Sequence, residues 1–206
     1  VKYFFQSLEE TMLRTTGNGQ AEPSTSYTSW YLTKIVLPDN EEIYFTYESN
    51  NYYFIVSNSQ QIAKANEYEC GLWAENSTNG HYTSPVYSHT MRVNGKRLKS
   101  ITSNLSKNGR VDFEYQDQIT NSDTVPDIVI KSISIHNDLS TNSTLIDKIE
   151  FNYLTTSNNR IFLTGIHHLD INDNYAFEYI SPNNFPERLA KSQDHWGFYN
   201  GANNTT

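Results

Sequence analysis

Cysteine is almost absent from this 206-residue sequence, and the single one, Cys70, cannot form a disulfide within the chain. Secreted eukaryotic domains rich in loops usually carry several disulfides, so this class of protein is disfavoured. Long apolar runs are also missing, because no stretch reaches the roughly 18 residues that a membrane-spanning helix needs. The chain begins with Val1 and carries no signal peptide, which we expect of a processed chain or of a piece of a larger protein.

Positive charge is scarce as well. The chain has 15 Lys and Arg against 23 Asp and Glu, which gives a formal net charge of -8. Proteins that bind nucleic acid gather basic residues against the phosphate backbone, and the only local cluster here is Lys96, Arg97 and Lys99. Such a cluster is too short for that role, so we expect no nucleic-acid partner.

Aromatic residues, by contrast, are abundant. They make up 14% of the sequence, with 15 Tyr and 10 Phe, within a hydrophobic total of 36%. Wide, flat side chains of this kind favour the pleated surface of a β-sheet. Length and composition together indicate one domain, residues 1–206, which we interpret as a repeat-like module of a larger protein.

One pattern occurs four times: an aliphatic or aromatic residue, then Phe two positions later, then Tyr two positions after that. The four segments are residues 43–47, 111–115, 149–153 and 175–179. Each follows a pair of aliphatic residues spaced three apart, which are Leu32 and Ile35, Leu98 and Ile101, Ile130 and Ile133, and Leu163 and Ile166. A recurring unit of this kind sets the architecture of the chain.

Alternation within the repeats predicts strands with one apolar and one polar face. Val111, Phe113 and Tyr115 alternate with charged residues, as in an antiparallel sheet that is wet on one side. The sequence therefore predicts an all-β fold, an antiparallel meander of successive hairpins forming an open, twisted sheet, with a β-sandwich as the alternative. The residues expected on the inward face are Ile35, Ile43, Phe45, Tyr47, Leu98, Ile101, Val111, Phe113, Tyr115, Ile149, Phe151, Tyr153, Ile166, Tyr175, Phe177 and Tyr179.

Turns are expected where Asn and Gly gather. Asn50-Asn51 and Asn94-Gly95 are such sites, the latter a common hairpin signal. Residues 15–29, with Gly, Pro, Ser and Thr, are interpreted as an exposed loop, and residues 58–90 as an insertion that interrupts the repeat. Residues 182–206 are expected to form no independent element, with Trp196 packing back on the sheet or docking on a neighbouring chain.

Residues 94–101, followed by Gly109 and residues 113–117, resemble a degenerate YD repeat of the Rhs family. Two further phrases, residues 29–35 and 194–201, resemble the region that precedes the Rhs core in large surface proteins of Bacteroidetes. The resemblance implies a long strip of β-hairpins in a bacterial cell-envelope or secreted protein. It also implies further repeats after Thr206, a structural or interaction role without enzymatic activity, and a protein or glycan partner.

Metal sites are weakly indicated. His81 and His89 lie on either side of a proline and could join Glu75, but the spacing of a zinc site is missing. Residues 170–173 contain Asp-x-Asn-Asp, yet the glycine and the distal glutamate of a calcium-binding EF-hand loop are absent. We therefore expect no bound metal and no cofactor.

Catalytic groups are equally hard to assemble. His167 and His168 are adjacent on an expected strand, so their side chains point to opposite faces. Asp194 and His195 could form a base held by a carboxylate, but no nucleophile is identifiable and Cys70 lies in no catalytic motif. We expect these groups to hold turns and strands in place, and we expect no enzymatic activity.

Aromatic side chains on the wet face are the remaining candidates for ligand binding. Tyr and Trp offer flat apolar surfaces with a polar handle, which suits stacking on sugars, and the candidates are Tyr44, Tyr52, Phe54 and Trp73. Packing between hairpins is the competing interpretation. A carbohydrate-binding module is thus one alternative function, and a carrier that holds an apolar ligand in a curved sheet is another.

Overall fold

The computed structural model describes residues 1–17, 23–64, 81–118, 127–138, 143–169, 173–187, 189–194 and 196–202. The strands are β1 (Lys2–Thr16), β2 (Ser24–Val36), β3 (Glu42–Ser59), β4 (Ile62–Lys64), β5 (His81–Thr83), β6 (Tyr87–Ser103), β7 (Arg110–Gln118), β8 (Asp127–His136), β9 (Leu145–Thr155), β10 (Ile161–His168) and β11 (Asp173–Ala176). Two short 3-10 turns, η2 (Ser106–Asn108) and η3 (Pro182–Asn184), accompany them, and the described ranges hold no α-helix. The predicted all-β class is confirmed.

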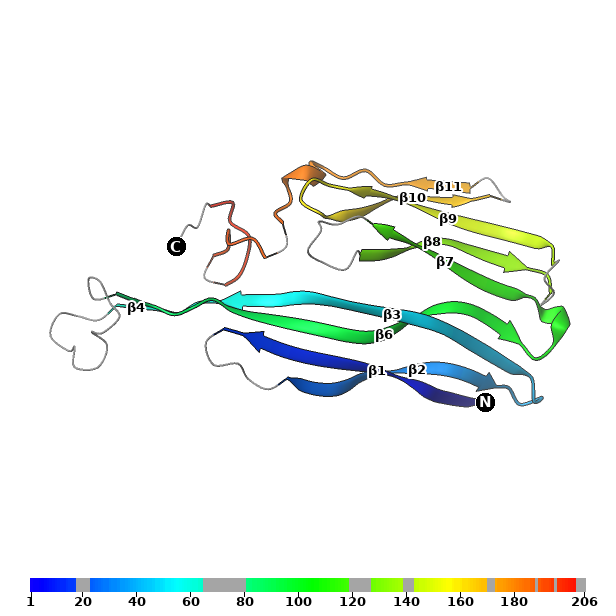
Figure 1. Ribbon diagram of the computed structural model, residues 1–206. Coiled ribbons are helices and arrows are strands. Elements are labelled where there is room, and N and C mark those ends of the chain that lie inside the picture. Colours follow the sequence, from blue (N-terminus) through cyan, green and yellow to red (C-terminus); the bar gives the residue numbers. More distant parts are fainter. Residues whose placement is uncertain are drawn as a thin grey trace.

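Nine of these strands form one antiparallel sheet in the order β1-β2-β3-β6-β7-β8-β9-β10-β11, while β4 and β5 pair separately. From β6 onward each strand pairs with the next strand in the chain, so the sheet is a meander of hairpins (Figure 1). Figure 1 shows β1 and β2 at the bottom, β3 and β6 above them, and the later hairpins in turn up to β11 at the top. The expectation of successive hairpins is therefore confirmed, and the described sheet has no second sheet packed on it as a sandwich would require.

One end of the sheet closes on itself. Residues 10–16 of β1 pair with residues 88–94 of β6, in addition to the pairing of β1 with β2. Since β2 pairs with β3 and β3 with β6, these four strands form a closed ring. The residues expected as an exposed loop, 15–29, instead include the end of β1 and the first half of β2. Pairing with a distant strand outweighs the local turn composition at these positions.

The predictions of turns at Asn50-Asn51 and at Asn94-Gly95 are wrong. Asn50 and Gly95 lie in the middle of β3 and β6 and pair with each other, as do Asn51 and Asn94. Gly95 allows β3 and β1 to lie close to β6, because a Cβ there would lie 3.1 Å from the backbone oxygen of Asn50 and 3.2 Å from Glu9 Oε2. The glycine is needed because another strand comes so near, and no turn forms there.

The long β3–β6 pair reaches into residues 58–90. Asn58 and Ser59 still pair with Ser88 and Tyr87, and the short strands β4 and β5 follow further out. Residues 65–80 lie outside the described part. The described portion of the expected insertion is thus an extension of one hairpin (Figure 1).

The sequence repeat corresponds to a structural repeat with one register. Within each of four hairpins the second aliphatic residue of the opening strand pairs with the first residue of the Phe-x-Tyr pattern. These pairs are Ile35 with Ile43, Ile101 with Val111, Ile133 with Ile149, and Ile166 with Tyr175. Between hairpins the Phe pairs with the next hairpin's Ile, as in Phe45 with Ile101, Phe113 with Ile133, and Phe151 with Ile166.

A β-bulge explains why the aliphatic pairs are spaced three apart and not two. In each opening strand one residue between them has no partner across the strand pair: Thr33, Lys99, Lys131 and Thr164. A bulge inserts one extra residue into one strand, so residues three apart then lie on the same face. Each aliphatic pair therefore reaches the apolar face together.

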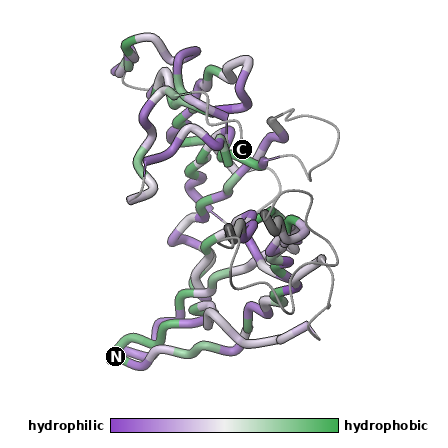
Figure 2. Tube along the Cα trace, turned by 90° about the vertical axis from the view of Figure 1, so that its left-hand side faces the viewer, coloured by the Kyte–Doolittle hydropathy of each residue, from purple (hydrophilic) through white to green (hydrophobic). Residues whose placement is uncertain are grey.

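Beyond the closed ring the sheet is a single layer with one apolar and one charged face. By this register the predicted inward residues that lie in paired strands share one side, and Glu114 is exposed on the other. In the last hairpin Tyr175, Phe177 and Tyr179 are exposed as well, and the latter two follow the last pair of β11. Burial is nevertheless slight, because among the described hydrophobic side chains Val93 alone is buried. The accessible surface is 14723 Å², whereas a compact monomer of 23.8 kDa exposes about 9,900 Å². Figure 2 shows hydrophobic and hydrophilic residues alternating along the trace of the described strands.

The segment after β11 is tied to the turn between β9 and β10. Asn158 Nδ2 donates to the backbone oxygen of Phe185 at 2.8 Å, and Arg160 Nε donates to that of Pro186 at 2.9 Å. The Phe162 ring lies 5.4 Å from that of Phe185. This segment therefore packs on an existing hairpin, and the described part of residues 182–206 holds only the short turn η3 and an isolated bridge between Gln193 and Tyr199.

The sheet does not bury Trp196, which is 78% exposed, so the first of the two expectations for this residue is wrong. Asp194 Oδ1 accepts hydrogen bonds from the backbone N–H groups of Trp196 and Phe198, both at 2.9 Å. These bonds define a small turn whose aromatic residues remain on the surface. Docking of Trp196 on a neighbouring chain stays a prediction.

Candidate functional site

Each repeated hairpin is joined by a tyrosine hydroxyl at the point where its two strands separate. The closing tyrosines donate to the backbone oxygen of the first aliphatic residue: Tyr47 to Leu32 at 2.8 Å, Tyr115 to Leu98 at 2.7 Å, Tyr153 to Ile130 at 2.9 Å, and Tyr179 to Leu163 at 2.8 Å. A bulge disrupts the ladder and leaves backbone groups without their usual partner. The hydroxyl supplies a donor there, so we call these four residues the latch tyrosines.

Burial raises the pKa of three latch tyrosines, Tyr47, Tyr115 and Tyr153. The neutral phenol is the donor in each latch, and desolvation favours that neutral form. Arg97 lies over the Tyr115 ring, 4.6 Å from its centroid, and adds a cation–π contact to the same hairpin.

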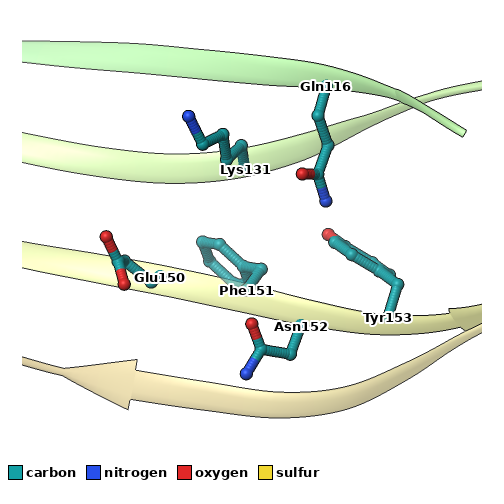
Figure 3. Close-up of a pocket in the computed structure, with 6 residues that line it drawn as sticks. All are labelled: Gln116, Lys131, Glu150, Phe151, Asn152 and Tyr153. Atoms are coloured by element: carbon teal, nitrogen blue, oxygen red, sulfur yellow. The ribbon is translucent and has the colours of Figure 1, made fainter.

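An open groove lies beside one latch, where β8 and β9 separate beyond the pair formed by Ser132 and Glu150 (Figure 3). Its volume is about 320 Å³, and its lining residues are Gln116, Lys131, Glu150, Phe151, Asn152 and Tyr153. Four of the six are polar, and Lys131 is already paired with Glu114 at 2.7 Å. The groove therefore suits water or a polar group, and it is not the apolar chamber that a lipid carrier needs.

The four aromatic candidates for sugar binding do not form one platform. Tyr52 and Phe54 lie together on β3, with ring centroids 6.1 Å apart and an interplanar angle of 16°. Tyr44 lies eight residues earlier on the same strand, where its hydroxyl donates to Glu42. Trp73 lies outside the described residues. The structure thus brings together two of the four.

The metal candidates are also dispersed. His89 Nδ1 shares a hydrogen bond with Thr15 Oγ1 at 2.9 Å, which joins β6 to β1. Glu75 and residues 170–172 lie outside the described part of the chain, as does the side chain of His81. Within the described ranges no three His, Cys, Asp or Glu side chains are grouped so that they could hold a metal ion.

His167 and His168 have different partners, as adjacent strand residues should. His167 lies between two amides, with Nε2 2.8 Å from Asn152 Nδ2 and Nδ1 2.8 Å from Asn174 Oδ1. His168 Nδ1 lies 3.1 Å from Asp147 Oδ2. The His167 ring links β10 to both of its neighbours, which supports the structural interpretation. His195 and Cys70 lie outside the described residues.

A polar cluster around Glu9 was missed by the sequence reasoning. The Glu9 carboxylate accepts hydrogen bonds from Thr28 at 2.8 Å, Ser29 at 3.0 Å and Tyr31 at 2.8 Å. Burial by itself raises the pKa of this carboxyl, but the three hydroxyls outweigh it and hold the pKa below its ordinary value. The donors lie on β2 and the acceptor on β1, so only the register of the sheet brings them together.

The last hairpin leaves its aromatic residues open to solvent. Tyr175 is 54% exposed, and Phe177 and Tyr179 are each 40% exposed. Their equivalents Phe113 and Phe151, in the interior of the sheet, are half-buried because a further strand lies beside each of them. The outer side of β11 is therefore a strand edge without a neighbouring strand in the described part of the chain.

Searches against protein-family models, curated proteins and solved structures gave no match for this chain. The described residues contain no helix of the length and apolar character needed to cross a membrane. The function must accordingly be argued from the hairpin register, the uncovered face and the free edge.

Proposed function

We propose that this chain is a non-enzymatic structural and interaction module, a strip of repeated hairpins in an Rhs/YD-repeat-like protein of the bacterial cell envelope or among secreted bacterial proteins. The observation that carries the proposal is the fourfold hairpin register, in which every unit presents the same aliphatic and aromatic residues on one side of a single layer. A repeat that only nearest neighbours stabilise is typical of extended scaffolds.

The apolar face supports an interaction role. Phe113 and Ile133, which pair across β7 and β8, are only half-buried, and Val111 with Ile135 continues the same apolar row. Monomeric proteins rarely leave a contiguous apolar surface of this kind in water. A protein surface is the partner that suits it, because Val111, Ile133 and Ile135, which surround Phe113 in this row, offer sugars neither a flat ring nor a hydrogen bond.

The charged face favours contact with water, so it determines which side of the strip stays in solvent. Ion pairs lie across its strands, as between Lys131 and Glu114 at 2.7 Å and between Arg97 and Glu48 at 2.5 Å. Exposed pairs contribute little stability, but a charged face opposes burial. The apolar side is therefore the side that a partner would cover.

Photo-crosslinking in the producing cells tests this function. A photoreactive phenylalanine analogue replaces Phe113 on the apolar face or, as the matched control, Glu114 one residue later on the charged face. We expect crosslinks to protein from position 113 and far fewer from 114, with the chain in the envelope or secreted fraction. Equal crosslinking from both positions, or a chain confined to the cytosol, would overturn the proposal.

A further inference from the structure

The sheet ends at a strand edge that is open for hydrogen bonding. β11 is the last strand in the order, and no described strand lies on its outer side (Figure 1). The backbone N–H of Phe177 donates inward to Thr164 O at 3.0 Å. Because successive residues of an extended strand direct their N–H and C=O groups to opposite sides, those of Ala176, the last residue of β11, face outward. Glu178, two residues further on, is expected to follow the same alternation. An edge of this kind is a template for a further strand.

Three junctions inside the chain show what such an edge accepts. At the junction of β7 and β8, Phe113 lies opposite Ile133 and Tyr115 opposite Ile130, while Lys131 forms the bulge between them. The junctions of β3 with β6 and of β9 with β10 have the same register and a bulge at the same place. In all three, a Phe-x-Tyr strand meets a strand of the pattern aliphatic, polar, any residue, isoleucine.

The segment that directly follows β11 has the same Phe-x-Tyr pattern, at Phe177 and Tyr179, and its Phe177 is still bonded to Thr164 of β10. The Tyr179 latch to Leu163 is already formed, so the last hairpin is complete on its inner side. We propose that this edge binds an extended protein strand of the pattern Leu or Ile, Thr or Lys, any residue, Ile, in antiparallel orientation. Phe177 lies opposite its isoleucine and Tyr179 opposite its first aliphatic residue. The inference rests on the proposed function, whose partner it specifies.

The bulge is part of the recognition. Without the extra residue, alternation would place one of the two aliphatic side chains on the charged face, beside Glu178. With it, both side chains continue the apolar face over Phe177 and Tyr179. A strand that alternates regularly therefore fits this edge less well than a strand with the aliphatic spacing of three.

A second folded copy of this chain cannot supply such a strand. The pattern occurs on β2, β6, β8 and β10, and each of these strands already has a neighbour on both sides. The partner is accordingly a strand from outside residues 1–206. Recognition through main-chain hydrogen bonds with side-chain pockets on alternate residues is the general mode of β-strand addition.

A peptide with the sequence of residues 127–136, which contains Ile130, Lys131 and Ile133, provides the probe. Amide hydrogen exchange of the whole chain is followed by NMR as the peptide is added. We expect saturable binding that slows exchange at Ala176 and Glu178 by roughly tenfold, because the outward N–H groups gain partners. A control peptide that lacks Lys131 should slow it less than about twofold.

The matched protein variant is Ala176→Pro, which removes one outward N–H and leaves the inward bonds of β11 intact. We expect its peptide affinity to fall about fivefold, as for one lost hydrogen bond, with the melting midpoint unchanged. Equal protection by the control peptide, or unchanged exchange at both residues, would contradict the proposal. So would concentration-dependent protection without peptide, which would make a second copy the occupant.

The two proposals fail separately. If the peptide does not bind but crosslinking remains confined to position 113, the proposal for the edge is wrong and the interaction module is retained. If the peptide binds at the edge but position 113 gives no crosslinks, the edge does accept a strand and the apolar face is not an interaction surface.

Discussion

The latch tyrosines allow a direct test of how the hairpins are held, and Tyr153→Phe is the cleanest change. It removes one hydroxyl and keeps the ring, so no cavity forms. The hydroxyl donates to Ile130 O at 2.9 Å. A hydrogen bond of this kind contributes about 1 kcal/mol, and a carbonyl left without a partner costs about 1–3 kcal/mol.

The groove beside Tyr153 admits water, which can replace the lost donor, so we expect the lower end of that range. Tyr153→Phe should lower the free energy of unfolding by about 1 kcal/mol, or the melting midpoint by about 2–4 °C for a chain of this length. Urea unfolding followed by circular dichroism measures it. Tyr115→Phe acts on another hairpin, and the double variant should add the two effects within about 0.5 kcal/mol.

Tyr175→Phe is the matched control, because its hydroxyl donates to Asp173 on an exposed strand. We expect its urea midpoint to equal that of the unmodified chain. An unchanged midpoint for Tyr153→Phe, or an equal loss for Tyr175→Phe, would show that the hydroxyl at the bulge does not stabilise the hairpin.

Alkaline pH probes the same hydroxyls. The folded pKa of Tyr47, Tyr115 and Tyr153 is raised by burial, while an unfolded tyrosine ionises near pH 10. Their contribution is therefore fully present below about pH 10 and is lost as pH rises from there through the folded pKa. Tyr153→Phe should lose less stability in this window than the unmodified chain. An identical alkaline decline in both proteins would contradict this account.

Three further changes test other parts of the fold by the same unfolding assay. Deleting Lys131 removes a bulge and reverses the faces beyond it, so we expect loss of cooperative unfolding, whereas Lys131→Ala should cost less than about 0.5 kcal/mol. Glu9→Gln should cost about 1 kcal/mol at neutral pH, and it should weaken the acid destabilisation that sets in as pH falls below about 4.3 toward the lowered folded pKa. Gly109→Ala should cost about 1 kcal/mol or more, since φ is 77° and a Cβ would lie 2.3 Å from His136 O. If deleting Lys131 and substituting it had equal effects, the bulge would not set the faces of the strand. An unaltered acid profile for Glu9→Gln would contradict the role of the Glu9 carboxylate, and full stability of Gly109→Ala would contradict the need for glycine there.

Much of the architecture could be predicted because the sheet keeps a strict alternation. Val111, Phe113 and Tyr115 identify one face without knowledge of any neighbour, and the fourfold repeat predicts that all hairpins share it. The spacing of Ile130 and Ile133 also indicated a bulge, since residues three apart share a face of a strand only when one extra residue lies between them.

What could not be predicted depends on contacts between distant strands. Asn94-Gly95 has the composition of a turn, yet it lies inside β6 because β3 pairs with it along its whole length. The latch acceptors are backbone oxygens, and side-chain identity does not reveal which carbonyl a bulge leaves free. Trp196 was expected to be covered because it is aromatic, but it is 78% exposed, and the single-layered part of the sheet has no interior to receive it.

The ring formed by β1, β2, β3 and β6 has a consequence for how the chain folds. Most hairpin contacts join residues close in sequence, as in the latch between Tyr179 and Leu163, 16 residues apart. Ring closure instead joins Glu10 to Asn94, 84 residues apart. Closing this long loop costs conformational entropy before any hydrogen bond between β1 and β6 can form.

During synthesis, β1 emerges about ninety residues before β6 is complete. For that interval residues 10–16 form an unpaired strand edge, of the kind that associates with other chains. We therefore expect the downstream hairpins to form rapidly and the ring to close last. The rate of that closing step then sets how long a newly made chain is exposed to misassembly.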